Sequence, residues 1–86
     1  HIQDFAKGVE RLVTSDINEN QLSALVSFAF NLGVNCLKKS SLLRLVNQNK
    51  DSPEIEKWFL AYNTAGGKVL SGLTRRRKAE SNLYFS

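Results

Sequence analysis

Hydrophobic and polar residues alternate with a helical period at the start of the chain. Apolar residues recur three or four positions apart between residues 2 and 13, with charged residues between them. This spacing places the apolar side chains on one face, so the pattern predicts an amphipathic helix over residues 2–13. The polar stretch 14–19 that follows is typical of a loop. The apolar positions of the helix are Ile2, Phe5, Val9, Leu12 and Val13.

The next segment is the most hydrophobic of the chain. Asn18 can cap a helix, and Gln21 stands three residues later, as in a capping box. Nearly every position in 22–32 is apolar, and a helix that is apolar on all sides is normally buried. Gly33 suits the left-handed conformation that ends a helix. We therefore expect the central helix of the domain here.

Two more helices are predicted from capping signals. After a short connection over 34–40, Ser40 or Ser41 can cap a helix that carries leucines and Val46 and fades into 47–49. Ser52 followed by Pro53 predicts another start, with Pro at the first helical position and acidic residues complementing the helix dipole. Its apolar face comprises Ile55, Trp58, Phe59 and Tyr62.

The chain breaks at the Ala65-Gly66-Gly67 stretch, and a last helix is predicted over 72–83. The one candidate strand, residues 68–70, is too short to define a sheet. We therefore predict an all-α fold, a compact array of about five helices that forms a single domain over residues 1–86.

Composition excludes several kinds of chemistry. Cys36 is the only cysteine, so an intrachain disulfide and a cysteine-rich zinc site are both excluded. His1 is the only histidine and stands at the terminus, a position that is consistent with a residue left over from cloning. The sequence therefore lacks the histidine that Ser-His or Cys-His catalysis would need within the domain. We expect neither a metal nor a cofactor.

The net charge restricts the class of binding partner only weakly. The chain has 12 basic and 8 acidic residues, a net charge of +4, which favours anionic partners such as nucleic acid, lipid or cell-wall polymer without choosing among them. No apolar run approaches the roughly 18 residues of a membrane span, and the chain does not begin like a signal peptide.

Several blocks of the sequence, in order, resemble the helical C-terminal lobe of phage-type lysozymes (endolysins), a family of glycoside hydrolases. Residues 20–33 are similar to the central helix of that lobe, and residues 1–14 to the helix that joins the two lobes. The similarity over residues 18–86 covers the lobe itself. The later blocks are Ser40-Ser41-Leu42-Leu43, Asn47-Gln48-Asn49, Trp58-Phe59, Ala61-Tyr62-Asn63, Ala65-Gly66-Gly67-Lys68-Val69-Leu70, Gly72-Leu73 and Arg75-Arg76-Arg77 through Glu80.

The resemblance implies host-cell lysis by cleavage of peptidoglycan glycan strands, held in a cleft between two lobes. It also implies that the catalytic residues belong to the N-terminal lobe, a segment that this sequence lacks. Glycosidases need two carboxyl groups about 5–9.5 Å apart. Each acidic residue of this chain has a simpler structural explanation, such as a helix dipole, a solvated face or an ion pair, so we predict no catalytic residue here. The acidic residues are Asp4, Glu10, Asp16, Glu19, Asp51, Glu54, Glu56 and Glu80.

Four residues are candidates for binding the glycan. The resemblance implies that Phe30 and Asn31 point toward the cleft, where the Asn31 amide can both donate and accept hydrogen bonds. The alternative for Asn31 is a bond to local backbone at the helix end. Tyr62 and Asn63 precede the Gly-Gly turn and are predicted to line the same cleft, although Tyr62 equally fits a core aromatic. Ala61 and Tyr62 replace Arg and Trp, which are common in the family.

Residues Arg75, Arg76, Arg77 and Lys78 form the densest charge in the sequence. Consecutive helical residues point around the whole circumference, so some are expected to pair with Glu80 while others face solvent. A basic amphipathic helix can also bind anionic membranes or cell wall. The helices around Gly33 vaguely suggest a helix-turn-helix, but the basic run lies elsewhere, so nucleic acid is not an expected partner.

Three hypotheses follow. The first is the lobe of an endolysin, synthesised in the bacterial cytoplasm, acting at the periplasmic cell wall, and inert without a catalytic lobe. The second is a free-standing regulator that binds an intact lysozyme, and the third is a wall- or membrane-active basic module. A lobe without its partner leaves an apolar surface uncovered, so we also expect self-association.

Overall fold

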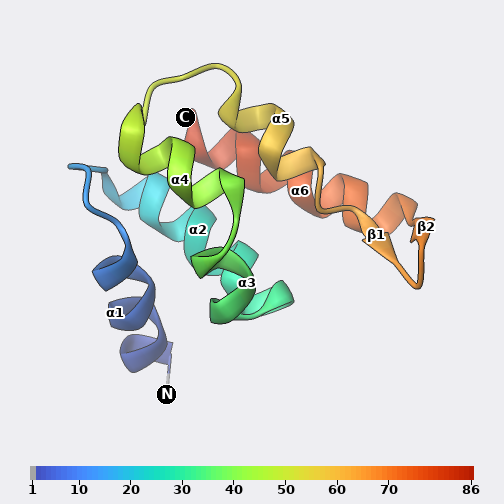
Figure 1. Cartoon of the computed structure of the whole chain (residues 1–86), viewed down its shortest axis with the longest axis horizontal. Helices are drawn as coiled ribbons and strands as arrows, with labels where there is room; N and C mark the ends of the chain where they lie inside the picture. The colour runs from blue at the N-terminus through green and yellow to red at the C-terminus, as the bar shows by residue number, and fades with distance from the viewer. Residues whose placement is uncertain (1) are drawn as a thin grey trace.

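The computed structural model describes residues 2–86, and the side chains from Asp4 onward. The predictions that concern His1 and the side chain of Ile2 lie outside this part. Six helices and one small hairpin follow one another in the described part (Figure 1): α1 Ile2–Leu12, α2 Glu19–Leu32, α3 Val34–Lys38, α4 Ser41–Gln48, α5 Ile55–Leu60, β1 Thr64–Ala65, β2 Lys68–Val69 and α6 Ser71–Tyr84. The all-α class is confirmed. The predicted connection over 34–40 contains α3.

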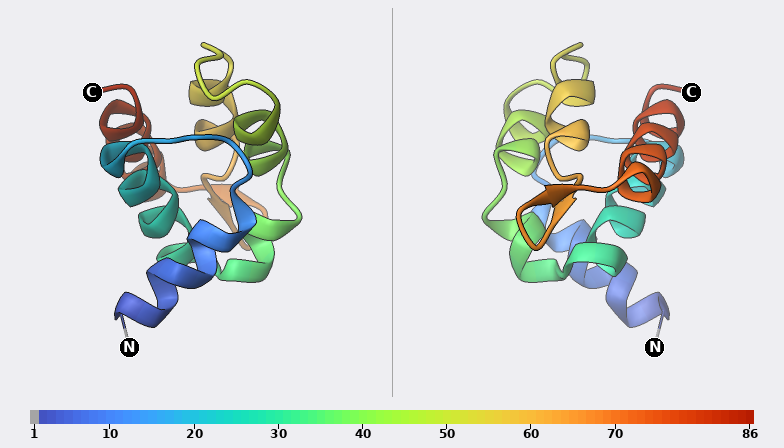
Figure 2. Two further views of the ribbon diagram at one scale, coloured as in Figure 1. Left: turned by 90° about the vertical axis from the view of Figure 1, so that its left-hand side faces the viewer. Right: turned by 90° about the vertical axis from the view of Figure 1, so that its right-hand side faces the viewer.

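Helix α2 is the centre of the array and packs against α1, α3 and α6. Figure 2 shows α2 and α6 side by side, with α4 and α5 beside them and α1 projecting at the other end of the molecule. The buried apolar core draws on every helix, and three of its aromatic rings meet edge to face. It comprises Val9, Ala24, Leu25, Phe28, Ala29, Leu37, Leu42, Leu43, Val46, Ile55, Phe59 and Tyr84.

The caps of α2 are those that the sequence predicts. The Asn18 side chain accepts a hydrogen bond from the Gln21 backbone N–H at 2.8 Å, and the Gln21 side chain accepts one from the Asn18 N–H at 2.8 Å. Both bonds satisfy amides that would otherwise lack partners in the first turn. Gly33 follows the helix with φ 101° and ψ 147°, a positive φ that favours glycine, although its ψ lies outside the left-handed helical region. Ser40, rather than Ser41, caps α4 through the Leu43 N–H at 3.0 Å.

Helix α5 begins later than predicted. Pro53 lies in a turn, and the helix starts at Ile55. The Ser52 hydroxyl accepts a hydrogen bond from the Glu54 N–H at 3.3 Å, and the Ser52 carbonyl accepts one from the Ile55 N–H at 3.2 Å. A hydroxyl that bonds the backbone two residues ahead stabilises a turn in competition with the helix. Tyr62, predicted on the face of this helix, lies two residues beyond its end.

The Gly-Gly break forms the tip of a hairpin. Thr64 pairs with Val69 and Ala65 with Lys68, so the connection has two residues. Gly66 and Gly67 have φ of 59° and 80°, and a two-residue turn of this kind needs positive φ at both positions. Within the described residues, no helix is long and apolar enough to cross a bilayer.

Candidate functional site

The ring of Phe28 on α2 contacts two of the predicted site residues, Arg77 and Tyr62, and Arg77 in turn contacts a third, Asn31. The Arg77 guanidinium lies over this ring, 5.2 Å from its centroid, and the Tyr62 ring meets it edge on at 5.1 Å and 84°. The Asn31 Oδ1 accepts a hydrogen bond from Arg77 Nη2 at 2.9 Å. We call Phe28, Asn31, Tyr62 and Arg77 the Phe28 cluster. Packing of α2 against α6 thus joins residues that are far apart in the sequence.

Arg77 is completely buried, and its partner is Glu80, which is 3% exposed. Arg77 Nε lies 2.7 Å from Glu80 Oε1, and Arg77 Nη2 donates to Glu80 Oε2 at 3.1 Å. Glu80 Oε2 also accepts from the Ser27 hydroxyl at 2.6 Å and from Arg76 Nε at 3.3 Å. A buried charge needs such compensation, because desolvation otherwise makes it costly. The hydrogen bonds from Ser27 to Glu80 and from Arg77 to Asn31 therefore fix α6 against α2, and Arg77 links the ion pair to the Phe28 cluster.

The Asn31 side chain bonds to another helix and not to local backbone, which was the alternative to a role in glycan binding. It is exposed, but its Oδ1 is held by a side chain on another helix and does not cap local backbone. An amide held by its oxygen is oriented with its NH₂ group free to donate. This geometry suits recognition of an acceptor, such as a carbonyl or hydroxyl oxygen, at the surface of the cluster.

Asn63 connects the hairpin to α6 through two hydrogen bonds. Its Nδ2 donates to the Thr74 hydroxyl at 3.1 Å, and its carbonyl accepts from the Leu70 N–H at 3.0 Å. Both bonds tie the start of the hairpin to the start of α6. Asn63 is half-buried and lies next in sequence to Tyr62, so it positions the backbone beside the cluster.

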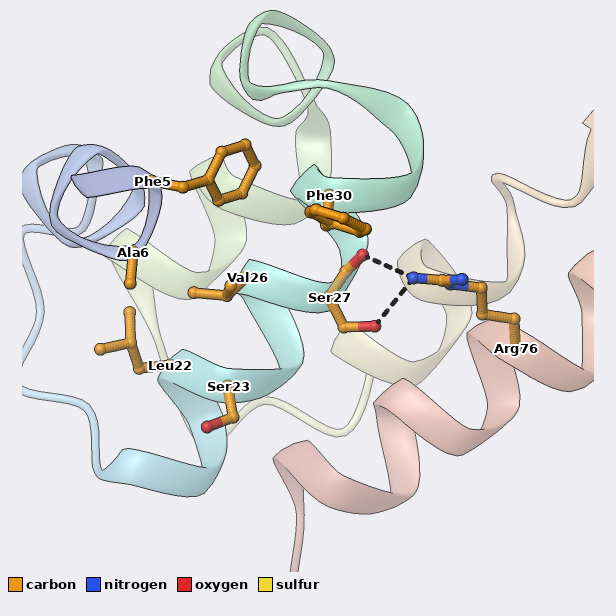
Figure 3. A pocket seen from close by; sticks show the side chains of 8 residues that line it. All are labelled: Phe5, Ala6, Leu22, Ser23, Val26, Ser27, Phe30 and Arg76. Carbon is orange, nitrogen blue, oxygen red and sulfur yellow. Dashed lines mark hydrogen bonds between the residues drawn. The ribbon is translucent and has the colours of Figure 1, made fainter. Parts of the chain in front are cut away.

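Phe30 lies apart from this cluster. It is 70% exposed and meets the Phe5 ring of α1 edge to face at 5.9 Å and 80°. Both rings border an open groove of about 490 Å³ between α1 and α2, which we call the α1–α2 groove (Figure 3). The groove is mainly apolar, with Ser27 and Arg76 joined by hydrogen bonds at one end. Its lining residues are Phe5, Ala6, Leu22, Ser23, Val26, Ser27, Phe30 and Arg76.

The four basic side chains of α6 lie in different environments. Arg77 is buried, Arg76 bonds Glu80 and the Ser27 carbonyl, and Lys78 pairs with Glu56 at 2.6 Å. Arg75 is exposed. The expected pairing with Glu80 is confirmed, and the run does not present one continuous basic surface.

The acidic residues also occupy separate places. Of the eight, six are exposed, Glu56 is paired with Lys78, and Glu80 is the buried partner of the arginines. No group of three or more histidine, cysteine or acidic side chains gathers in the described part as a metal site would require. The exposed six are Asp4, Glu10, Asp16, Glu19, Asp51 and Glu54.

Two contributors to these surfaces are missing from the predicted site residues. The sequence pattern places Phe5 only on the apolar face of its helix, whereas in the structure its ring packs against Phe30 at the groove. Ser27 is a small polar residue within an apolar helix, and its hydroxyl and carbonyl serve Glu80 and Arg76. An isolated polar residue on a buried helix is the signal that points to such a partner.

Comparison with known proteins identifies the class to which this helical array belongs. The sequence model described as phage lysozyme matches residues 1–80. The chain belongs to the phage lysozyme family. It is 40% identical over 85 residues to the endolysin of Bacillus phage B103, a match that covers 99% of this chain and 32% of that endolysin.

Other relatives agree. The endolysin of Lactococcus phage c2 is 39% identical over 80 residues, covering 93% of this chain and 33% of the endolysin. Among solved structures, the muramidase domain of SpmX from Asticaccaulis excentricus superposes with a TM-score of 0.88 at 32% identity. That superposition covers 99% of this chain and 60% of the other. The chain therefore spans about a third of the length of these endolysins.

Proposed function

We propose that this chain is the helical lobe of an endolysin that faces peptidoglycan glycan strands and acts in lysis only together with a catalytic lobe. The observation that carries the proposal is the Phe28 cluster within a phage lysozyme fold. There the exposed Asn31 amide is oriented by the buried Arg77, whose guanidinium lies over the Phe28 ring, and the half-buried Tyr62 ring packs against that same Phe28 ring. Sugars offer both hydrogen-bond acceptors and apolar faces, which the Asn31 amide and the amphipathic Tyr62 ring can respectively engage.

The distribution of acidic groups supports the part of the proposal that concerns catalysis. Glu80 is the one acidic residue of the described part that is buried; its Oε2 accepts hydrogen bonds from Arg76, Arg77 and Ser27, and its Oε1 lies 2.7 Å from Arg77 Nε. Hydrolysis of a glycosidic bond needs a free carboxyl group as acid and a second one across the bond. Nothing in the Phe28 cluster supplies either group.

The α1–α2 groove supports a partner lobe. Exposed apolar surface of this kind, with Phe30 at its edge, is costly to leave in water and marks contact sites. We propose that a catalytic lobe covers the groove, with Phe5 and Phe30 buried at the contact, while the Phe28 cluster faces the glycan. This assigns the four predicted residues two tasks: Phe30 to lobe contact, and Asn31, Tyr62 and Asn63 to the glycan side.

The basic-module alternative has less support from the contacts. Its residues would have to face a membrane or wall together, whereas Arg77 is buried and Arg76 and Lys78 are engaged in ion pairs. A regulator that binds an intact lysozyme would use the same groove as the lobe, so the two differ in the effect on lysis rather than in the surface. Slower clearing of cell walls by an active endolysin would support the regulator if it persists with the Asn31→Ala variant, in which competition for the glycan is expected to be weakened.

The test uses purified peptidoglycan and the 86-residue chain. We expect the chain to sediment with the polymer without releasing soluble glycan fragments. Asn31→Ala should weaken binding, whereas Asn35→Ala, a matched exposed amide on α3, should not. Fragment release by the chain alone would contradict its proposed dependence on a catalytic lobe. Absence of binding, or equal weakening by both variants, would contradict the glycan-facing role.

A further inference from the structure

A second cavity lies between the turn that precedes α5 and the end of α6. Its volume is about 540 Å³, and it shares no lining residue with the α1–α2 groove. Its walls combine carboxylates, a hydroxyl and an amide with two apolar side chains. Such a lining offers several hydrogen-bond acceptors next to apolar surface. The lining residues are Asp51, Pro53, Glu56, Ser81, Asn82 and Phe85.

The two carboxylates of this cavity differ in ion pairing. Glu56 Oε2 accepts a hydrogen bond from the Lys78 ammonium at 2.6 Å, an ion pair whose side chains are 44% and 52% exposed. Asp51 is exposed and forms no ion pair with any residue of the described part. One rim of the cavity thus already holds an ammonium group of the chain itself, while the other carboxylate stays open to a ligand.

Ser81 contributes a hydroxyl to the cavity from the buried side of α6. The residue is 1% exposed and lines the cavity. Its hydroxyl makes no hydrogen bond to the other residues that the structure describes, and it is not among the enclosed side-chain atoms that lack a partner, so its oxygen remains reachable from the cavity. Asn82, the neighbouring residue on α6, presents an exposed amide to the same cavity.

The apolar wall is formed by a ring that is held in place. Phe85 is 46% exposed and packs edge to face against the buried Tyr84 at 5.0 Å and 70°. Pro53 adds a rigid apolar side chain to the lining. Aromatic faces attract cations, and apolar walls accommodate the methylene stem that often carries one.

We propose that this cavity binds a primary ammonium group on an apolar stem. Asp51 is its counter-ion, the Ser81 hydroxyl and the Asn82 amide oxygen accept hydrogen bonds from its other N–H groups, and the stem lies against Phe85. An ammonium fits because it has three donors and a compact charge, whereas a hard metal ion would demand more carboxylate ligands. Lysine-like diamino acids and N-deacetylated amino sugars both carry such a group. The proposal does not depend on the glycan-facing role of the Phe28 cluster.

An NMR titration of the ¹⁵N-labelled chain tests it and separates the two sources. The probes are Nα-acetyl-lysine amide, the same compound acetylated also at its side-chain nitrogen, and glucosamine. We expect a free amine to shift the backbone amide signals of Asp51, Ser81 and Asn82, and the fully acetylated compound to leave them in place. A response to the lysine compound alone identifies a diamino acid as the source, and a response to glucosamine alone identifies an amino sugar.

Substitutions at and away from the cavity test whether Asp51 binds the ammonium group. Asp51→Asn should weaken binding by about tenfold, as expected for loss of a charged hydrogen-bond partner. Asp4→Asn makes the same change of charge at an exposed position of α1 and should leave the affinity unchanged. Lys78→Gln releases Glu56 and should tighten binding. The proposal is overturned if neither amine shifts these signals, if the fully acetylated compound shifts them equally, or if the two Asp variants weaken binding alike.

Discussion

Arg77 and Glu80, three residues apart on α6, form an ion pair whose Nε and Oε1 atoms are 2.7 Å apart and shielded from solvent. The pair faces α2, where Ser27 donates to the carboxylate and Asn31 accepts from the guanidinium. The charged groups of the α2–α6 interface are therefore neutralised by one another and not by a ligand. They orient the amide that we assign to glycan recognition.

Removing one member of this pair should be strongly destabilising. Glu80→Ala leaves Arg77 buried without its counter-ion, so we expect the free energy of unfolding to fall by about 3–5 kcal/mol. Urea denaturation followed by circular dichroism measures it. Glu56→Ala removes the exposed partner of Lys78 and should cost less than about 1 kcal/mol. Similar losses in the two variants would show that burial of the Arg77–Glu80 pair has no special weight.

The capping box at the start of α2 gives a graded prediction. Asn18→Ala removes the acceptor for the Gln21 N–H and should lower stability by about 1 kcal/mol, whereas Asn18→Gly should cost only a few tenths. The difference between the two variants in thermal or urea unfolding is the measurement. If glycine were as costly as alanine, the side-chain bond and not the backbone preference at this position would dominate.

Glycine positions should respond to alanine with opposite signs. Gly67 has φ of 80° at the hairpin tip, so Gly67→Ala should destabilise by about 1–2 kcal/mol. Gly8 lies within α1, and a Cβ there meets no atom within 4 Å, so Gly8→Ala should stabilise by up to about 1 kcal/mol. Differential scanning calorimetry of both variants tests this. Stabilisation by Gly67→Ala would contradict the hairpin geometry.

Tyr84 predicts a loss of stability at alkaline pH. Burial, and secondarily the negative charge of Asp51, raise the pKa of Tyr84 from 10.0 to about 12. A group whose folded-state pKa is raised contributes stability that is complete below pH 10.0 and is lost as pH rises toward 12. Its hydroxyl donates to the Lys50 carbonyl at 2.8 Å, a bond that requires the proton.

The expected loss through this group is at most about 2–3 kcal/mol. Urea unfolding at pH 9 and at pH 11.5 should show a smaller drop for Tyr84→Phe than for the parent chain, because phenylalanine cannot ionise. Tyr62→Phe serves as the control that keeps Tyr84. An equal drop in the parent and in Tyr84→Phe would mean that other groups cause the alkaline sensitivity.

The α1–α2 groove predicts concentration-dependent self-association of the isolated chain. Phe30→Ser should reduce it, because this ring is 70% exposed at the groove, and should change the fold little. Val69→Ser removes another exposed apolar side chain, on the hairpin, and should have no effect on association. Sedimentation velocity over a range of concentrations compares them. A monomer at all concentrations would contradict the expectation of self-association.

Sequence alone predicted the features that depend on neighbours along the chain. The capping box of Asn18 and Gln21, the Ser40 cap and the helical periods all rest on contacts within a few residues. The pairing of Glu80 with arginines one turn away was predictable for the same reason. The family blocks added the overall helical architecture.

Only the tertiary structure decided which side chain of a run is buried and which surfaces meet. Arg77 rather than Arg75 faces α2, because the angle at which α6 packs selects one face of the helix. The same packing separates Phe30, at the groove, from Asn31, at the Phe28 cluster, although they are adjacent in sequence. Consecutive helical residues point about 100° apart, so contacts between helices, which local sequence does not encode, divided the predicted site in two.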